Sequence, residues 1–227
     1  MHTSVAIFVA KALTESEIEG CRILEVGSRN INGSVRPIIE SRNPQNYTGV
    51  DMVDGKGVDE VVDATNIVEE FGENSFDVVV STEMLEHAKN WKNTINNIKR
   101  VCENEGVIVL TTRSKGFKFH GYPNDYWRYE VGDMKEIFKD HKIELLESDP
   151  ESPGVFIKAS KPCEFSQKDI SQQPLYSVVS GKRTVNCPVT YSDTAFEKLQ
   201  IQLREDGLKF TVATALLNAS RKIYNTM

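Results

Sequence analysis

The sequence predicts an α/β fold in which helices cover both faces of a mostly parallel sheet. Short apolar runs alternate with helical patterns over residues 1–162, which is typical of parallel strands joined by helices. The runs Val78–Val80 and Val107–Leu110 are apolar without alternation, as expected for strands covered on both faces. We therefore expect strands at Arg22–Val26, Tyr47–Asp51, Glu60–Asp63, Phe76–Ser81, Val107–Thr111, Ile143–Ser148 and Val155–Ser160.

Helices are expected between these strands. Ala88, Trp91, Ile95, Ile98 and Cys102 recur at spacings of three and four, which places them on one face of a helix after the fourth strand. The segment Thr14–Glu17 fits a capping box, so a short helix should precede the first strand. Asp133 is a candidate cap for a helix that runs through Phe138.

Residues 163–227 differ from the rest of the chain. The segment 166–183 is polar and contains Pro174 and Gly181, which indicates a connector. From Asp193 on, apolar residues again follow helical spacing, first in Ala195, Leu199 and Leu203, then in Leu208, Val212, Ala215, Leu216, Ala219 and Ile223. We expect a main domain at 1–162 and, at 163–227, a connector with a C-terminal helical extension. The extension could pack on the main domain, close an acceptor pocket or pair two subunits in a homodimer.

The composition excludes several classes of protein. With 27 Lys+Arg against 33 Asp+Glu, the net charge of −6 disfavours binding to nucleic acid, which depends on basic residues. No apolar run approaches the ~20 residues that cross a bilayer, and Val5–Ala10 lacks the basic lead of a signal peptide. Cys21, Cys102, Cys163 and Cys187 show no metal-binding spacing, so we expect no metal site and a cytoplasmic protein with reduced thiols.

The ends of the first three strands carry the residues most suited to a ligand. Gly27 follows the first strand, where sheets of this class bind ligands. Asp51 lies 24 residues after Gly27, a spacing at which a carboxylate can accept hydrogen bonds from ribose hydroxyls. Arg29 interrupts the glycine pattern of dinucleotide-binding loops. Together with Glu25 and Asp63, Asp51 would form an acidic rim for a cationic ligand with a hydroxylated sugar.

A family resemblance unites these segments. Glu25–Gly27, Gly49–Asp51, Asp63–Ala64 and the run Phe76–His87, which ends in an E-x-L-E-H pattern, resemble the class I S-adenosylmethionine-dependent methyltransferases, in particular the type 11 branch. The resemblance spans Arg22 to Lys161. It implies a Rossmann-like sheet of seven strands that ends in a hairpin, with S-adenosylmethionine as the cofactor.

The resemblance also implies roles for single residues. Asp51 would hold the ribose hydroxyls, and Asp63 would face the adenine amino group. Arg29 and Ile31 stand where the family has glycines in its cofactor-binding loop. The turn containing Gly33 would serve the same purpose two residues later. The other residues implied at the cofactor are Glu25, Gly27 and Ser28 along the methionine part, Met52 and Ala64 beside the adenine, and Ser81, Thr82 and Glu83 near the sulfonium.

The segment Phe119–Tyr129 follows the fifth strand and is rich in aromatic and charged residues. Loops on a rigid scaffold often carry binding groups, so we expect acceptor contacts here. His120 is the first candidate for a general base and Asp125 the second. Tyr122, Tyr126 and Trp127 would wall the acceptor pocket, and Arg128 would meet an acidic acceptor group or Asp125. Equally, the loop could be an aromatic plug that packs the end of the sheet.

His87 lies near the expected methyl-transfer centre, where it could border the site or pack against Trp91. The predicted function is therefore methyl transfer to oxygen or nitrogen of a small-molecule acceptor, such as a sugar or a secondary-metabolite intermediate, without nucleic-acid or membrane partners. Two alternatives remain open, namely a non-catalytic binding or scaffold subunit and a nicotinamide-dependent oxidoreductase.

Overall fold

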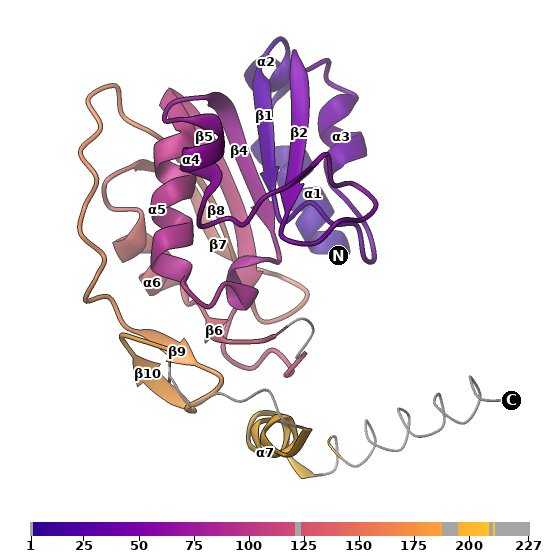
Figure 1. The fold of residues 1–227 in the computed structure, drawn as a ribbon, viewed down its shortest axis with the longest axis vertical. Coiled ribbons are helices and arrows are strands. Elements are labelled where there is room, and N and C mark those ends of the chain that lie inside the picture. Colours follow the sequence, from indigo (N-terminus) through magenta and orange to yellow (C-terminus); the bar gives the residue numbers. More distant parts are fainter. Residues whose placement is uncertain (1, 121–123, 188–194, 209–210, 212–227) are drawn as a thin grey trace, which may run out of the picture.

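A seven-stranded sheet forms the centre of the molecule (Figure 1). The computed structural model describes residues 2–120, 124–187, 195–208 and 211. The strand order is β3-β2-β1-β4-β5-β8-β7; β1 to β5 run parallel, and the hairpin of β7 and β8 joins β5 antiparallel. The strands are β1 (Arg22–Val26), β2 (Asn46–Asp51), β3 (Glu60–Val61), β4 (Phe76–Thr82), β5 (Cys102–Arg113), β7 (Lys142–Ser148) and β8 (Gly154–Ser160). The predicted fold class is confirmed, with β3 shorter and β5 longer than expected.

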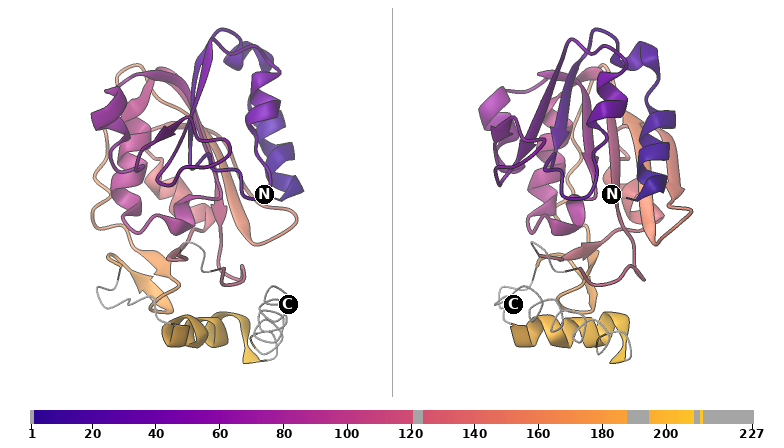
Figure 2. Two further views of the ribbon diagram at one scale, coloured as in Figure 1. Left: turned by 45° about the vertical axis from the view of Figure 1, so that its right-hand side comes forward. Right: turned by 90° about the vertical axis from the view of Figure 1, so that its right-hand side faces the viewer.

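Helices cover both faces of this sheet, as Figure 2 shows from two sides. Along β4, Val78 and Val80 pack into one hydrophobic cluster and Val79 into the other, which explains why this strand is apolar without alternation. The face of Val78 carries α1 (Thr3–Ala12), α2 (Glu15–Ile18) and α3 (Arg36–Glu40). The face of Val79 carries α4 (Ile67–Phe71), α5 (Trp91–Val101) and α6 (Val131–Ile137).

The helix starts agree with some of the predicted caps and differ from others. The capping box at Thr14 is confirmed at the start of α2. The cap predicted at Asp133 was wrong by one turn, because Glu130 is the N-cap of α6. Asp133 is the third residue of the helix, and its carboxylate accepts a hydrogen bond from the backbone N–H of Glu130. Helix α1 was not predicted, although its buried residues Val5, Phe8, Val9 and Ala12 follow helical spacing.

The segment predicted to be a connector contains two strands. Strands β9 (Leu175–Ser177) and β10 (Lys182–Thr184) form a second sheet with β6 (Trp127–Arg128), in the order β10-β9-β6. Leu175 is fully buried in the cluster on the α5 face. Strands β9 and β10 are three residues long and lie in a polar segment, so they leave little pattern in the sequence.

Helix α7 (Ala195–Asp206) confirms a helical segment after the connector. Its predicted stripe does not face the main domain, because Leu199 and Leu203 are 41% and 37% exposed, whereas Ile201 is buried. Glu205 accepts a hydrogen bond of 3.0 Å from the Tyr176 hydroxyl of β9. The second stripe, apart from the exposed Leu208, lies outside the described residues.

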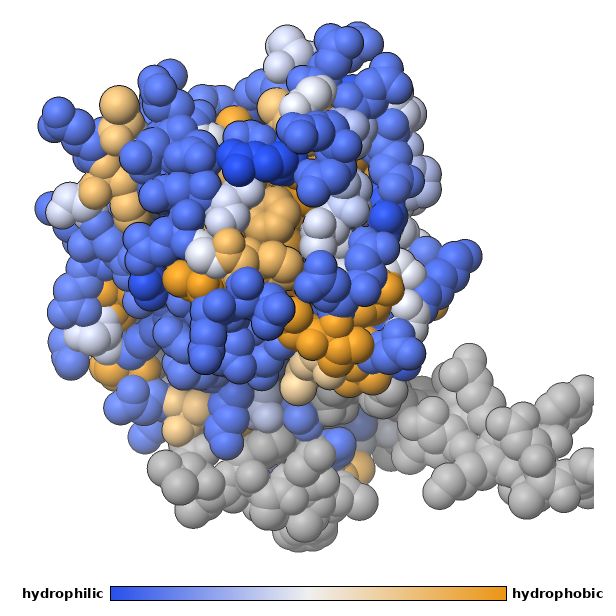
Figure 3. Space-filling view, turned by 45° about the horizontal axis from the view of Figure 1, so that its top comes forward, coloured by the Kyte–Doolittle hydropathy of each residue, from blue (hydrophilic) through white to orange (hydrophobic). Residues whose placement is uncertain are grey.

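The face shown in Figure 3 is mostly hydrophilic, with a smaller apolar area. Four of the most exposed large apolar side chains, Ile31, Met52, Val53 and Val61, lie in or after β1 to β3. All four cysteines are free thiols. In the described part of the chain, none of the helices has the length and apolarity needed to span a bilayer.

Candidate active site at the carboxyl edge of the sheet

The turn after β1 requires a glycine at its first position. Gly27 has φ of +82°, and a Cβ atom there would lie 2.6 Å from Met84 Cγ. The backbone N–H groups of Gly27 and Ser28 both donate to the carbonyl of Val50, at 2.8 and 3.0 Å. The turn is thereby fixed against the end of β2, where a ligand can approach its backbone.

The loop after β2 folds onto this turn. Asn30 N donates to Lys56 O at 2.7 Å, and a Cβ atom at Gly57 would lie 2.7 Å from Ser28 O. Arg29 packs its side chain along Gly55, with Nε 2.9 Å from the position of a Cβ there. The arginine that departs from the family pattern is thus accommodated by a second glycine-containing loop.

Gly33 lies in the turn predicted to replace the missing glycines. Its N–H donates to Asn30 Oδ1 at 2.9 Å, and its φ is +133°. The side chain of Asn30 therefore closes a compact turn between β1 and α3.

Asp51 and Asp63 present carboxylates at this edge. The Asp51 carboxylate is half-buried and accepts hydrogen bonds from Val53 N at 3.0 Å and Arg29 N at 3.4 Å. Asp63 is exposed and accepts from Thr65 N at 2.8 Å and Thr65 Oγ1 at 2.7 Å. Each carboxylate can accept further bonds, as the predicted ribose and adenine contacts require. Nearby, Met52 is 62% exposed and Ala64 is half-buried.

Glu25 does not belong to this acidic rim, which corrects the prediction of three acids at one edge. Successive side chains of a strand alternate between faces, and Leu24 and Val26 face α5. Glu25 is 2% exposed, and its carboxylate accepts a hydrogen bond of 2.6 Å from the Tyr47 hydroxyl. Burial raises the pKa of Glu25 to about 7, against the opposing effects of the Tyr47 hydrogen bond and the Arg36 charge.

The ends of β1 and β4 carry two buried hydroxyls. Ser28 is 3% exposed and Ser81 is fully buried, and neither hydroxyl has a hydrogen-bond partner within the described residues. Thr82 beside Ser81 is half-buried. Buried polar groups are normally hydrogen-bonded, so unpaired hydroxyls at this edge favour a ligand there.

Glu83, directly after β4, is held in an unusual conformation. Its φ is +56°, which is uncommon for a residue other than glycine. Its carboxylate accepts from Thr111 Oγ1 at 3.1 Å and forms an ion pair with Arg113. Strained backbone of this kind tends to cluster at functional sites.

The segment after β5 contains a buried ionic network. Asp125 Oδ2 contacts His120 Nδ1 at 3.1 Å and accepts from Arg128 Nη2 at 2.7 Å. Burial would raise the pKa of Asp125, but Arg128 and His120 hold it well below its usual range. Burial would lower the pKa of His120, but the Asp125 and Glu86 carboxylates raise it to about 9. The two residues predicted as base candidates therefore form a charged pair.

The structure decides between the roles predicted for three residues of this segment. Of the two partners predicted for Arg128, it shows Asp125, because Arg128 is 1% exposed and bonds that carboxylate, which leaves it unavailable to an acidic acceptor. Trp127 is 1% exposed and donates from Nε1 to Lys89 O at 3.2 Å, and Tyr126 is 7% exposed. These residues plug the end of the sheet, the alternative reading of this loop. Tyr122 lies outside the described residues.

His87 borders this network. Its ring centroid lies 4.8 Å from that of His120 in an edge-to-face arrangement. The ring of Trp91 contacts those of Trp127 and Tyr129. Glu86, which is fully buried, received no predicted role, although it belongs to the E-x-L-E-H pattern that identified the segment.

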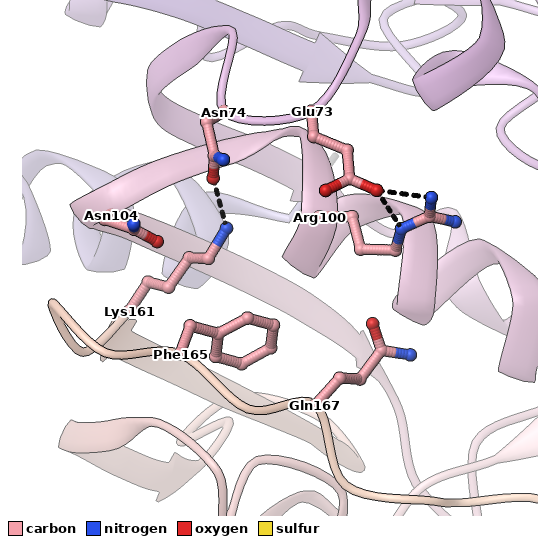
Figure 4. A pocket seen from close by; sticks show the side chains of 7 residues that line it. All are labelled: Glu73, Asn74, Arg100, Asn104, Lys161, Phe165 and Gln167. Carbon is pink, nitrogen blue, oxygen red and sulfur yellow. Dashed lines mark hydrogen bonds and ion pairs between the residues drawn. The ribbon is translucent and has the colours of Figure 1, made fainter.

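A hollow lies at the end of the strands opposite to this edge (Figure 4). It measures about 290 Å³. Lys161 donates there to Asn74 Oδ1 at 2.7 Å, and Arg100 bonds Glu73. Because these residues lie near the start of β4 and the end of β8, the hollow is separate from the edge that carries Asp51 and His120.

The chain belongs to a methyltransferase family. A family model described as "Methyltransferase domain" matches residues 2–148. The fold is that of the class I S-adenosylmethionine-dependent methyltransferases, and the family implies binding of S-adenosylmethionine or its product. No curated protein matches the sequence significantly.

Solved structures share the fold at low identity. A chain of the complex between the Haloferax volcanii Trm112 methyltransferase activator and the putative methyltransferase has a TM-score of 0.57 at 14% identity, over 73% of this chain and 92% of that one. An S-adenosylmethionine-dependent methyltransferase from Mesorhizobium loti has a TM-score of 0.54 at 14% identity, over 69% and 98%. The Burkholderia thailandensis 1,6-didemethyltoxoflavin-N1-methyltransferase, with 1,6-didemethyltoxoflavin and S-adenosylhomocysteine bound, has a TM-score of 0.57 at 13% identity, over 70% and 80%.

Proposed function

We propose that this protein transfers the methyl group of S-adenosylmethionine to oxygen or nitrogen of a small-molecule acceptor, such as a sugar or a secondary-metabolite intermediate. The observation that carries the proposal is the half-buried Asp51 carboxylate beside the Gly27 turn, at the edge where sheets of this kind bind ligands. Membership of the methyltransferase family favours this function over nicotinamide-dependent oxidation.

The residues at the edge fit the cofactor chemically. Asp51 and Asp63 supply acceptors for ribose hydroxyls and for the adenine amino group. Ser28 and Ser81 supply buried hydroxyls without partners in the described residues. The two carboxylates also favour a cationic ligand, because opposite charges attract. We assign the remaining predicted contacts, from Gly27, Gly33, Met52, Ala64, Thr82 and Glu83, to the same ligand as proposals.

The protein's own contribution to the reaction is alignment and exclusion of water. The cofactor supplies the electrophilic methyl group and the leaving group. Alignment of an acceptor with that group can lower the barrier by ~7–11 kcal/mol. His120, whose side chain is 34% exposed beside the buried Glu86 and Asp125, is the residue of the network that an acceptor can reach.

The C-terminal part supports two further proposals. The exposed Leu199 and Leu203 of α7 form an apolar stripe that could pair two copies of the chain. The second proposal is a domain boundary near residue 162, across which β9 packs on the main domain through Leu175.

A scaffold role is the second candidate function. The observation that favours it is Arg29, which stands in place of a family glycine and packs on Gly55.

Calorimetric titration with S-adenosylmethionine and with NAD tests the cofactor, and methyl transfer to a panel of hydroxyl and amine acceptors tests catalysis. We expect one S-adenosylmethionine bound per chain, no NAD bound and transfer to at least one acceptor. Binding without transfer to any acceptor would favour the scaffold role. Binding of NAD alone would contradict both candidates.

A further inference from the structure

Three side chains converge on one point after β4 and β5. Glu86 and His87 belong to the 3₁₀ turn η1 (Leu85–His87), and His120 lies in the loop after β5. One ligand atom of each lies within 4.8 Å of the other two. Glu86 Oε1 is 3.8 Å from His120 Nε2 and 4.0 Å from His87 Nε2. These distances are too long for hydrogen bonds, so the three atoms surround a shared space.

The two imidazole rings are oriented by their other nitrogens. His120 Nδ1 lies 3.1 Å from Asp125 Oδ2, and His87 Nδ1 contacts the carbonyl oxygen of Asn124. Carbonyl and carboxylate oxygens accept hydrogen bonds, so Nδ1 is the donor in both rings. In the neutral form of each ring, Nε2 then carries a lone pair that faces Glu86.

Glu86 is oriented in the same way. It is fully buried, and its Oε2 accepts a hydrogen bond of 2.8 Å from Thr112 Oγ1. Its Oε1 is buried and has no hydrogen-bond partner within the described residues. A buried carboxylate oxygen without a hydrogen bond is unfavourable unless positive charge lies beside it. Protonated His120 supplies such a charge from one side, at 3.8 Å, whereas one metal cation in place of that proton would contact all three atoms.

We propose that Glu86, His87 and His120 bind a divalent transition-metal ion. Two imidazoles and one carboxylate are a donor set suited to Zn²⁺ or Fe²⁺, and three protein ligands leave a coordination position open. Ligand bonds of ~2.0–2.2 Å in a tetrahedral site place two donors roughly 3.4 Å apart. The three ligand atoms, which lie within 4.8 Å of one another, with two of the separations at 3.8 and 4.0 Å, must therefore close in around the ion on binding. The contact of His120 with Asp125 is the carboxylate–histidine arrangement that orients metal ligands.

The structure thus points away from the prediction that there is no metal site, which rested on the spacing of the four cysteines. The ligands come from the Glu86-His87 dyad and from a histidine 33 residues after His87, a spacing that spans α5 and β5. Thr112, which orients Glu86, lies 26 residues after it, whereas Asp125 lies five residues after His120.

An open metal position would give the acceptor a binding group, a consequence that rests on the proposed function. A hydroxyl bound there would have a lowered pKa and lose its proton to solvent. The O–CH₃ bond would form as the S–CH₃ bond breaks, which leaves S-adenosylhomocysteine. In this arrangement His120 acts as a ligand instead of a free base.

The test is titration of the EDTA-treated full-length chain with Zn²⁺, Co²⁺ and Mg²⁺, followed by calorimetry and, for Co²⁺, visible absorption. We expect one Zn²⁺ or Co²⁺ per chain and at least 100-fold weaker binding of Mg²⁺, which prefers oxygen ligands. Glu86→Gln, His87→Asn and His120→Asn should each weaken Zn²⁺ binding at least tenfold. His2→Asn, which removes an exposed imidazole outside the group, should not.

Thermal unfolding shows whether each variant is folded, so that loss of Zn²⁺ binding can be distinguished from loss of the fold. Zn²⁺ should raise the Tm of the native chain and of His2→Asn, but not that of His120→Asn, whose side chain is the most exposed of the three. The proposal is overturned if neither Zn²⁺ nor Co²⁺ binds, if binding survives in His120→Asn, or if it is lost in Cys163→Ser, which removes an exposed thiol. S-adenosylhomocysteine binding, measured in the same samples, shows separately whether the proposed function stands.

Discussion

The two halves of the sheet's carboxyl edge are built differently. After β2 and β3, Asp51 and Asp63 are half-buried or exposed, and the described structure gives them backbone and hydroxyl donors from their own or the adjacent loop. After β4 and β5, Glu86, Asp125 and Arg128 are at most 1% exposed and are held by each other or by neighbouring segments. The first half offers polar groups to a ligand, whereas the second half fixes the geometry around His87 and His120.

This difference predicts separable effects of substitution. Groups after β2 and β3, which we call the open half, should contribute mainly to cofactor affinity and little to stability. Groups after β4 and β5, the buried half, should contribute strongly to stability, because a buried charge without its partner is unfavourable.

The largest effect is expected at the buried pair. Arg128→Met removes the guanidinium and leaves the fully buried Asp125 without its bidentate partner. We expect the free energy of unfolding, measured by urea denaturation, to fall by about 3–5 kcal/mol. Lys139→Ala, which breaks an exposed ion pair of 3.1 Å with Glu136, is the control and should change it by less than about 1 kcal/mol. Equal effects of the two substitutions would remove the distinction between the halves.

A second effect concerns Glu25, which was predicted to lie in the open half but is buried on the face of the sheet that α3 covers. Its folded-state pKa of about 7 lies above the ~4.3 of an unfolded chain, so the folded state binds more protons between these values. Stability should therefore fall as the pH rises from about 4.5 to 7, by at most about 3 kcal/mol.

Glu25→Gln should abolish this loss and stabilise the protein at pH 8 relative to the native chain. Urea denaturation at pH 5 and pH 8 measures the difference. Glu19→Gln, at an exposed carboxylate, is the control and should leave the pH dependence as it is. A pH-independent difference between Glu25→Gln and the native chain would show that Glu25 does not titrate in this range.

In the open half, Asp51→Ala should weaken S-adenosylhomocysteine binding by about 1–3 kcal/mol, because ribose hydroxyls lose their acceptor. The free energy of unfolding should change by less than about 1 kcal/mol, since the carboxylate is only half-buried. Asp54→Ala, at an exposed residue three positions further on, is the matched control for charge. Unchanged calorimetric affinity in Asp51→Ala would refute the ribose role.

The smallest effect is expected for Asp63→Ala. Asp63 is exposed and already bonds Thr65 twice, so an added bond to the adenine amino group should be worth about 0.5–1.5 kcal/mol. Calorimetry with S-adenosylhomocysteine, compared with inosine-containing S-inosylhomocysteine, which lacks that amino group, isolates the contact. If Asp63→Ala weakens both ligands equally, Asp63 does not contact the amino group.

Much of the fold could be predicted because its signals are local. Apolar runs such as Val78–Val80 mark doubly covered strands, and β1 was predicted with its observed bounds. The second sheet could not be predicted, since β6 and β9 pair over more than 40 residues of intervening chain and are only two and three residues long.

The candidate site divides in the same way. Gly27 and Asp51 were recognisable because a turn and a strand end are local features. Glu25 was misplaced because its face depends on strand alternation. The contact of Arg128 with Asp125 was one of its two predicted partners, but the pairing of its strand with β9 has no signal in the spacing of residues.

A crystal structure with S-adenosylhomocysteine tests the central claim most directly. We predict density at the carboxyl edge, between the Gly27 turn and the end of β2, with the ribose hydroxyls within hydrogen-bonding distance of the Asp51 carboxylate. Density elsewhere, such as in the hollow lined by Lys161 and Phe165 at the opposite end of the strands, with Asp51 free of the ligand, would contradict the account.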